Sequence, residues 1–469
     1  MEYTLRFSRP SSVANLDDQT HVFLAAALQA RAASPEIFTG QPANPLVFRN
    51  LLLSLHDVVE ARYYRPDLWR YLDPVLTAGS EQLHLECFSS CGSVYGRVDF
   101  DSDAFAEARF HRSGTTNVDF HAAFTGHLAS LMPGRKVQLE MGQESVALSS
   151  EAGTTIERKV KLPERWMRGF LNVQALHRRA RQRLELDALS ARQLILAVPA
   201  KAPDPAYIVL GRGAPQILSR PPAQQDALCV SGLQRLRLLK RILPDIKSIG
   251  VFEIADVQAS VWVVQTAHGR LVLGLSSSVK HGFSGDGDAL RQLTVHLPEL
   301  EIEDARRAAE ILNRFSAVEL AEYLDLGLAD TYERLDTLSR QGLLGYDVQA
   351  DSYFYRVLPF VAADPGRLSR LKGSQAILDA AGVEIESLAR DGKRLRASGF
   401  VKGVGALYTT ALEVDETGYL AQGTCNCQWI GKHGLQRGPC KHMLALRFAA
   451  EAACARRENI CLDLADAQS

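Results

Sequence analysis

The stretch Cys425-Asn426-Cys427, followed after twelve residues by Cys440-Lys441-His442, decides the fold of the C-terminal part of this chain. Three thiols and one imidazole are a donor set that a tetrahedral zinc ion takes in proteins. Two ligand pairs must come from separate backbone elements, and the residues between them must form a loop that closes around the ion. The spacing therefore predicts one structural zinc site.

The residues around the two pairs predict the elements that carry them. A β-rich run, Tyr408 to Val414, is followed by a turn, and Tyr419 to Thr424 can return as the second strand of a hairpin. Pro439 stands at a helix start, and the strong helix formers from Lys441 to Ala450 follow it. We expect Cys425 and Cys427 at a strand end and the second pair on the first turn of a helix.

This arrangement resembles the SWIM zinc finger, whose pattern is Cys-x-Cys, a variable loop, and Cys-x-His opening a helix. The resemblance covers roughly residues 398 to 450, and the whole chain is more distantly similar to bacterial SWIM zinc finger family proteins. It implies a structural metal held by Cys425, Cys427, Cys440 and His442. His433, within the loop, is an alternative fourth ligand on spacing alone.

The composition is that of an ordinary globular protein. The 469 residues are 46% apolar and 23% charged, and 53 basic against 54 acidic side chains give a net charge of −1. No overall field attracts nucleic acid or an anionic membrane. The N-terminus does not resemble a signal peptide, and His21 to Ala30 is too short to span a bilayer. We expect a cytoplasmic location without membrane association, and reduced thiols at the five cysteines outside the site.

The predicted fold class is α+β with several domains. The pattern of strands and helices divides the chain as follows: an α+β domain over 1–190, a second α+β domain over 191–300, a winged-helix-like module over 301–360, the SWIM finger region over 366–450, and a C-terminal tail over 451–469. In the first two domains, expected strands include 82–88, 93–100, 118–124, 136–148, 194–198, 207–210, 249–254, 261–265 and 271–275, and expected helices include 50–64, 165–189 and 233–242.

Three short helices and two strands are predicted in the module. The helices are expected at 303–315, 316–324 and 329–341, with a capping-box-like start at Ser316 and with Leu335 and Leu338 turned inward. The strands are expected at 342–346 and 352–357. Helix-turn-helix followed by a wing is the natural interpretation.

Charge argues against DNA binding by this module. Residues 301–360 hold six Arg and no Lys against twelve acidic residues, a net of −6. Asp330, Glu333 and Asp336 are expected on the outer positions of the third helix. Because phosphate contacts supply most non-specific affinity, an acidic surface favours a protein-interaction or structural role.

The balance reverses towards the finger, where residues 366–450 carry twelve basic and seven acidic side chains, a net of +5. Candidate nucleic-acid contacts are Lys393, Arg394, Arg396 and Lys402, although a solvated strand or turn is the commoner explanation for such residues. For the Arg-rich stretch 165–189, which contains Arg178, a solvated helix face is the default and an interaction surface is the alternative.

No phosphate-binding loop, dinucleotide fingerprint, nucleophile elbow or metalloprotease motif is present in the sequence. We therefore expect a non-enzymatic adaptor that binds one Zn²⁺ and docks protein partners in a larger complex. The resemblance implies partners from a MoxR-type ATPase and von Willebrand A-domain system. The alternative is a DNA-binding protein that uses the finger and the adjacent basic segment.

Overall fold

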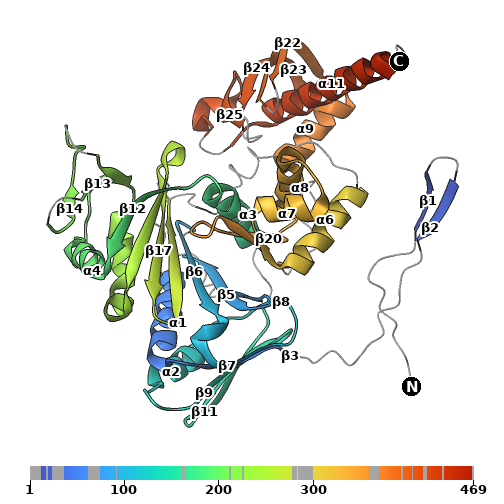
Figure 1. Ribbon diagram of the computed structural model, residues 1–469. Coiled ribbons are helices and arrows are strands. Elements are labelled where there is room, and N and C mark those ends of the chain that lie inside the picture. The colour runs from blue at the N-terminus through green and yellow to red at the C-terminus, as the bar shows by residue number, and fades with distance from the viewer. Residues whose placement is uncertain are drawn as a thin grey trace.

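The chain folds into a mixed α and β structure built from several separate sheets (Figure 1). The computed structural model describes residues 12–16, 19–23, 36–61, 74–90, 92–160, 164–210, 213–223, 226–276, 283, 299–358, 369–391, 394–403, 405–415, 420–435 and 438–466. Buried apolar side chains form two clusters, one drawn from residues 37–358 and one from residues 377–454. The C-terminal part therefore has a core of its own.

The centre of the larger unit is an antiparallel sheet of eight strands. Its order is β12 (Arg181–Asp187), β16 (Ser248–Ile254), β17 (Ala259–Thr266), β18 (Gly269–Leu275), β6 (Val94–Asp101), β5 (Gln82–Phe88), β4 (Val75–Ala78) and β8 (Gly114–Asn117). Strands from both predicted N-terminal domains thus meet in one sheet, and the predicted limit at residue 190 lies in helix α4 (Ala188–Ala197), just after β12.

Smaller sheets and helices surround this centre. The five-stranded sheet has the order β11 (Gly153–Arg158), β10 (Ser145–Ser150), β9 (Val137–Gly142), β3 (Glu36–Pro42) and β7 (Phe105–Phe110), and a three-stranded sheet has the order β14 (Gln216–Leu218), β13 (Ala206–Val209) and β15 (Leu228–Val230). The helical segments are α1 (Pro45–Glu60), η1 (Ser102–Ala104), α2 (Ala122–Ser130), α3 (Glu164–His177), α4 (Ala188–Ala197), η2 (Leu233–Asp245) and η3 (Ala255–Val257). A hairpin of β1 (Ser12–Leu16) and β2 (Gln19–Phe23) lies near the N-terminus.

Helix α1 covers one face of the large sheet. Asn44 caps it by accepting hydrogen bonds from the backbone N–H groups of Leu46 and Val47, at 3.1 and 3.3 Å, and Pro45 occupies a favourable first position. Its apolar side, including Leu51 and Leu55, is fully buried. The sheet face beneath it is apolar, which explains why these elements pack together.

The opposite face of β5 and β6 is charged and equally buried. His84 and Glu86 on β5 stand opposite Asp99 and Arg97 on β6, and none of the four side chains is more than 3% exposed. Residues 299–358 cover this face: the Arg97 guanidinium donates to the carbonyl of Tyr346, and His84 stacks on Phe354 at 4.2 Å. Ion pairs and hydrogen bonds therefore act beside the aromatic contacts between the sheet and this segment.

Residues 299–358 contain the three helices and two strands that the sequence predicts, with a further short strand. They run α6 (Glu299–Leu312), β19 (Arg314–Phe315), α7 (Ala317–Leu324), α8 (Leu328–Arg340), β20 (Leu344–Asp347) and β21 (Ser352–Tyr355), and the strands pair in the order β19-β21-β20. The capping box at Ser316 is confirmed, and Leu335 and Leu338 are fully buried. We call residues 299–358 the helical module.

Helix α8 departs from the sequence prediction at Asp336. This residue is only 4% exposed and pairs with Arg178, which follows α3 and lies over the Tyr332 ring at 4.8 Å. The expectation that Asp336 faces outward is wrong, because α3 of the same chain covers that side of α8. The predicted helix 165–189 is also wrong beyond His177, since Arg181–Asp187 forms β12.

Two other predicted strands are helical over part of their range. Residues 122–130 form α2 where a strand was expected from 118 to 124, and residues 188–197 form α4 where a strand was expected from 194 to 198. A short apolar run does not distinguish a buried strand from a buried helix. No helix in the described ranges is long and apolar enough to cross a membrane.

The C-terminal unit is a four-stranded antiparallel sheet with three helices that contact it. It contains α9 (Ser369–Asp379), β22 (Val383–Asp391), β23 (Arg394–Gly403), β24 (Ala406–Val414), β25 (Leu420–Cys425), α10 (Gln428–His433) and α11 (Lys441–Asp466). Helix α11 packs across all four strands and against α9. It continues to Asp466, so most of the range predicted as a C-terminal tail is helical.

Candidate metal centre

The four predicted ligands come together at one point of the C-terminal unit. One ligand atom from each of Cys425, Cys427, Cys440 and His442 lies within 4.8 Å of the others. All four side chains are buried, with exposed fractions of 9%, 6%, 2% and 4%. Among the described residues, no other group of three or more His, Cys, Asp or Glu side chains converges in this way.

Local structure delivers the ligands in two pairs, as the sequence predicts. Cys425 ends β25, and Cys427 is the residue before α10. Cys440 precedes α11, where its carbonyl accepts a hydrogen bond from the N–H of Leu444 at 3.1 Å, and His442 lies in the first turn. The site therefore joins a strand end to a helix N-terminus, whose positive end favours a thiolate.

The imidazole of His442 is held by an aromatic neighbour. Its ring stacks on Tyr408 of β24, with ring centroids 3.9 Å apart. A side chain at Gly403 would lie 2.6 Å from the Tyr408 ring and 3.1 Å from Nε2 of His442, so the absence of one gives this stack room. Nδ1 lies 3.8 Å from the Cys425 sulfur, whereas Nε2 is buried without a hydrogen-bond partner.

A hydrogen bond between two thiols of the cluster moves their pKa values in opposite directions. A hydrogen bond from the Cys440 thiol is the main influence on Cys425, and it lowers the pKa of Cys425 to about 4. The same interaction and burial raise the pKa of Cys440. A first thiolate thus forms readily in this cluster, and thiolate is the form that binds metal ions.

The loop between the ligand pairs is fixed by two residues that the sequence does not single out. Arg370 of α9 lies over the Trp429 ring at 4.5 Å and donates to the carbonyl of Pro439 at 3.0 Å. The indole N–H of Trp429 donates to the carbonyl of Gly438 at 3.1 Å. Trp429 stands next to Ile430 in a loop that also holds Leu435, so nothing in the sequence marks it as the anchor, and nothing points to Arg370.

His433, the alternative ligand, does not belong to the cluster. It lies at the end of α10 and contacts Trp429 edge to face, at 4.8 Å between ring centroids. The structure therefore places His442, and not His433, with the three cysteines.

The predicted nucleic-acid contacts lie on β23, apart from Lys393, which is outside the described residues. Arg394, Arg396 and Lys402 are exposed and alternate with buried residues, so they share the outer face of the strand. Arg396 pairs with Glu413 of β24 at 3.0 Å. Two other basic residues of the +5 excess are engaged within the protein. Arg447 is 1% exposed and pairs with Glu451, and Arg370 donates a hydrogen bond to the carbonyl of Pro439.

Comparisons with known proteins assign no family. No protein-family model matches the chain, and no curated protein matches it. Among solved structures, the proliferating cellular nuclear antigen of Entamoeba histolytica aligns with a TM-score of 0.35 and 10% identity, over 51% of this chain and 98% of that chain. A likeness at this level supports no conclusion about function.

Proposed function

We propose that this protein is a non-enzymatic interaction protein in which one structural zinc ion organises a SWIM-type finger that docks protein partners. The buried group of three cysteines and one histidine is the observation that carries the proposal. Its donor set is typical of structural zinc sites in reducing compartments.

The dimensions of the group support a tetrahedral ion. With metal–sulfur and metal–nitrogen distances of about 2.3 and 2.05 Å, neighbouring sulfur and nitrogen ligands of zinc lie about 3.6 Å apart. Nδ1 of His442 lies 3.8 Å from the sulfur of Cys425. All four ligand atoms lie within 4.8 Å of one another, so their separations would shorten by about 1 Å at most to close the site around one ion.

Four protein ligands also favour a structural role over a catalytic one. A catalytic zinc ion keeps a position for water or substrate, whereas here four buried side chains would fill the coordination sphere. When bound, the ion would tie β25 to α11. Trp429 and Arg370, which contact each other, hold the loop between the two ligand pairs in place.

The helical module supports protein docking more than DNA binding. Its order of helices and strands is that of a winged helix, in which the third helix would enter the major groove. In this chain the corresponding α8 packs on α3 through Asp336 and Tyr332. The net charge of residues 301–360 is −6, which would repel phosphates.

Nucleic-acid binding is the alternative, and the exposed basic face of β23 is the feature that favours it. Three cations on one strand face could contact phosphates, although Glu413 offsets Arg396. A MoxR-type ATPase and a von Willebrand A-domain protein in the cytoplasm are the partners we propose, on the resemblance of the finger alone.

Zinc content tests the site first. We expect one equivalent of zinc per chain in protein purified without chelator, and its loss in the Cys425→Ser/Cys440→Ser double variant. Cys229→Ser, a half-buried cysteine elsewhere, is the matched control and should retain the ion. Less than about half an equivalent in the parent protein, or full retention in the double variant, would refute the assignment.

Binding experiments then separate the two functions. Co-elution of the purified chain with the MoxR-type ATPase or the A-domain protein of the same organism should require zinc. Mobility shifts on DNA and RNA at two salt concentrations test the alternative. Tight binding that weakens steeply with salt, and that an Arg394→Gln/Lys402→Gln variant removes, would favour a nucleic-acid-binding protein instead.

A further inference from the structure

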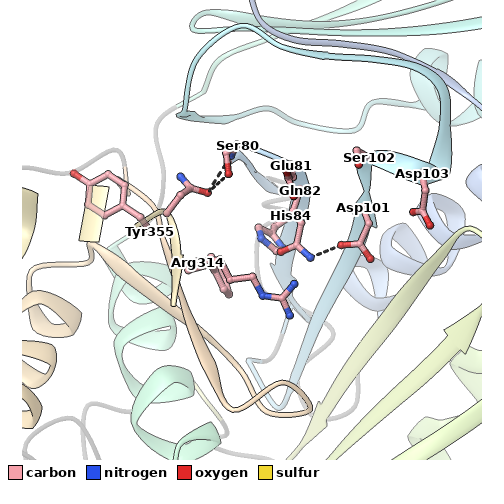
Figure 2. Close-up of a pocket in the computed structure, with 12 residues that line it drawn as sticks. Ser80, Glu81, Gln82, His84, Asp101, Ser102, Asp103, Arg314 and Tyr355 are labelled. Carbon is pink, nitrogen blue, oxygen red and sulfur yellow. Dashed lines mark hydrogen bonds between the residues drawn. The ribbon is translucent and has the colours of Figure 1, made fainter. Parts of the chain in front are cut away.

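The strands of the helical module face the large sheet. Asn313, just before β19, accepts a hydrogen bond from the backbone N–H of Ser80 in the β4–β5 turn, at 3.0 Å. Figure 2 shows this junction, where Arg314 of the module and His84 of β5 line one small cavity. Helix α7, in contrast, packs on α6, α8 and β19 of the module itself.

Helix α7 leaves one side open. Its buried residues Ala317, Leu320 and Ala321 recur at helical spacing and turn toward the rest of the module. A helix turns by about 100° per residue, so the remaining positions gather on the opposite side. These positions are all exposed: Val318, Glu319, Glu322 and Tyr323.

Exposed hydrophobic side chains are concentrated in this part of the module. Of the large hydrophobic side chains that are exposed in the described ranges, four lie between residues 311 and 328: Ile311 at 67%, Val318 at 52%, Tyr323 at 51% and Leu328 at 48%. Val318 and Tyr323 share the open side of α7, and Leu328 begins α8 directly after the turn. Single exposed apolar residues are ordinary, but a group of them marks an interaction surface.

The charge of this part of the surface has one sign. Residues 316–333 hold five acidic side chains and no Lys, Arg or His. Glu322 and Asp325 are exposed and form no ion pair with a described residue. The arginines on either side of the stretch, Arg314 and Arg334, form ion pairs with other acids of the module. The flanking arginines therefore do not balance its negative charge.

We propose that this surface docks a basic, amphipathic segment of a partner protein, whose apolar side chains cover the exposed hydrophobic residues and whose Lys or Arg side chains pair with the acids. We call the surface the α7 face; its residues are Val318, Glu319, Glu322, Tyr323, Asp325 and Leu328. Charge complementarity selects this occupant. An acidic surface repels phosphates, so nucleic acid and an anionic membrane do not fit it.

The order of residues around α7 explains why the segment must be amphipathic. At about 100° per residue, the two glutamates lie between Val318 and Tyr323. A partner that supplies only positive charge would leave both hydrophobic side chains in water, and a purely apolar partner would bury the carboxylates without a counter-charge. Only a segment with both kinds of side chain satisfies the whole face.

The inference rests on the proposed role as an interaction protein and adds a docking surface that uses no zinc ligand. The Cys425→Ser/Cys440→Ser variant should therefore bind such a segment as tightly as the parent chain does. Zinc-containing protein that does not bind it would overturn the α7 face alone, whereas absence of zinc from protein that still binds it would overturn the metal assignment alone.

Fluorescence anisotropy on the full chain at low salt tests the face with three labelled peptides of about 14 residues, long enough at about 1.5 Å per residue to span α7 and the following turn. The first peptide has Leu and Lys at helical spacing, the second replaces every Lys by Glu, and the third replaces every Leu by Ser. We expect the first to bind at least about tenfold more tightly than either of the others, and salt to weaken its binding.

A matched pair of charge variants locates the contact. Glu322→Gln/Asp325→Asn should weaken binding of the first peptide about threefold or more, because two exposed ion pairs are lost. Glu384→Gln/Glu386→Gln removes the same charge from exposed positions of β22 and should leave the affinity unchanged.

A second matched pair keeps every charge and removes apolar surface. Val318→Gln/Tyr323→Gln replaces two exposed residues of α7 with good helix formers and should weaken binding about tenfold. Leu189→Gln/Leu196→Gln makes the same kind of change on α4, where the two side chains are 64% and 63% exposed, and should have no effect.

The proposal is overturned if the first peptide does not bind at roughly 1 mM, if the third binds as tightly as the first, or if either control variant weakens binding as much as its counterpart on α7. A second copy of the chain is the other candidate occupant, and sedimentation of the full chain tests it. A monomer is expected. A dimer that Glu322→Gln/Asp325→Asn dissociates would assign the face to self-association and overturn the partner proposal.

Discussion

Asp347, at the end of β20, fastens the helical module to the large sheet. Its carboxylate is 4% exposed and pairs with Arg270 of β18, with Arg314 at 3.3 Å, and more distantly with Arg97 at 3.9 Å. It also accepts hydrogen bonds from the backbone N–H groups of Gln349 and Ala350 at 3.1 and 3.3 Å. We predict that Asp347→Asn loosens this junction.

The expected cost follows from the partners that remain. Asn can still accept from the two backbone N–H groups, but its amide nitrogen would then face the guanidinium of Arg270, and the negative charge is lost. Asp99 alone would be left to balance Arg97 and Arg270 in a buried site. Removing one partner of a buried pair costs about 3–5 kcal/mol. At about 2 °C per kcal/mol for a unit of this size, Tm should fall by roughly 6–10 °C.

Thermal unfolding combined with hydrogen exchange measures the effect, because exchange locates it in β20 and β21. Asp304→Asn, an exposed acid on α6, removes the same charge and should change Tm by about 1 °C or less. A fall of less than about 2 °C for Asp347→Asn, with no faster exchange between residues 344 and 355, would refute the view that ion pairs hold the module to the sheet.

Three further outcomes follow from the structure. At both Asp99 and Asp347, neighbouring arginines outweigh burial and lower the pKa of the carboxyl group. The stability that the two carboxylates contribute is therefore complete above their unfolded pKa of about 3.9 and is lost as pH falls through the folded values. In acid-unfolding experiments the junction should open below about pH 4, and an Asp347→Asn variant should lose less stability in that range. Arg178→Met removes the guanidinium that pairs with the buried Asp336 carboxylate and should destabilise α8 by up to about 3–5 kcal/mol. Arg178→Met/Asp336→Leu should partly restore stability in denaturant unfolding, and equal loss in both variants would contradict the pairing. Chelation should accelerate hydrogen exchange in residues 369–466 and leave residues 36–358 protected, because the two parts have separate apolar clusters, and a uniform rise along the chain would show that they unfold together.

The metal cluster could be predicted because its information is local. Each ligand pair lies within three residues, and the flanking hairpin and helix have strong signals of their own. The residues that support it could not be predicted. Tyr408, Arg370 and Trp429 meet only after α9, β24 and the loop have packed, and the spacing of the sequence contains no trace of those contacts.

The large sheet shows the same division. Strands β5, β17 and β18 were predicted to within two residues because their β-branched and apolar residues form dense runs between turns. The polar residues His84, Glu86, Arg97 and Asp99 would suit a face exposed to water, yet residues 344–355 bury them. The local pattern shows which side of a strand is polar. It does not show what covers that side, and here Tyr346, which contacts Arg97, lies 249 residues further along the chain.

Helix α4 illustrates a signal that was present but outweighed. Asp187 accepts a hydrogen bond from the N–H of Ser190 at 2.7 Å and caps the helix. The predicted helix 165–189 runs through this position, and the apolar run 194–198 favours a strand on its local pattern alone. The break after His177, where α3 gives way to β12, has no glycine or proline to mark it.

The pairing of β6 with β18 has a consequence for how the protein is made. Residues 94–101 find their neighbour only at residues 269–275, so β6 leaves the ribosome long before its second partner exists. At about 5–20 residues per second, translation of the roughly 170 intervening residues takes roughly 10–35 s. During that interval the β4–β5–β6 segment presents an unpaired strand edge, the kind of surface that other chains can join. Chaperone demand during synthesis should therefore be concentrated before residue 275 is released, and a chain truncated ahead of β18 should aggregate.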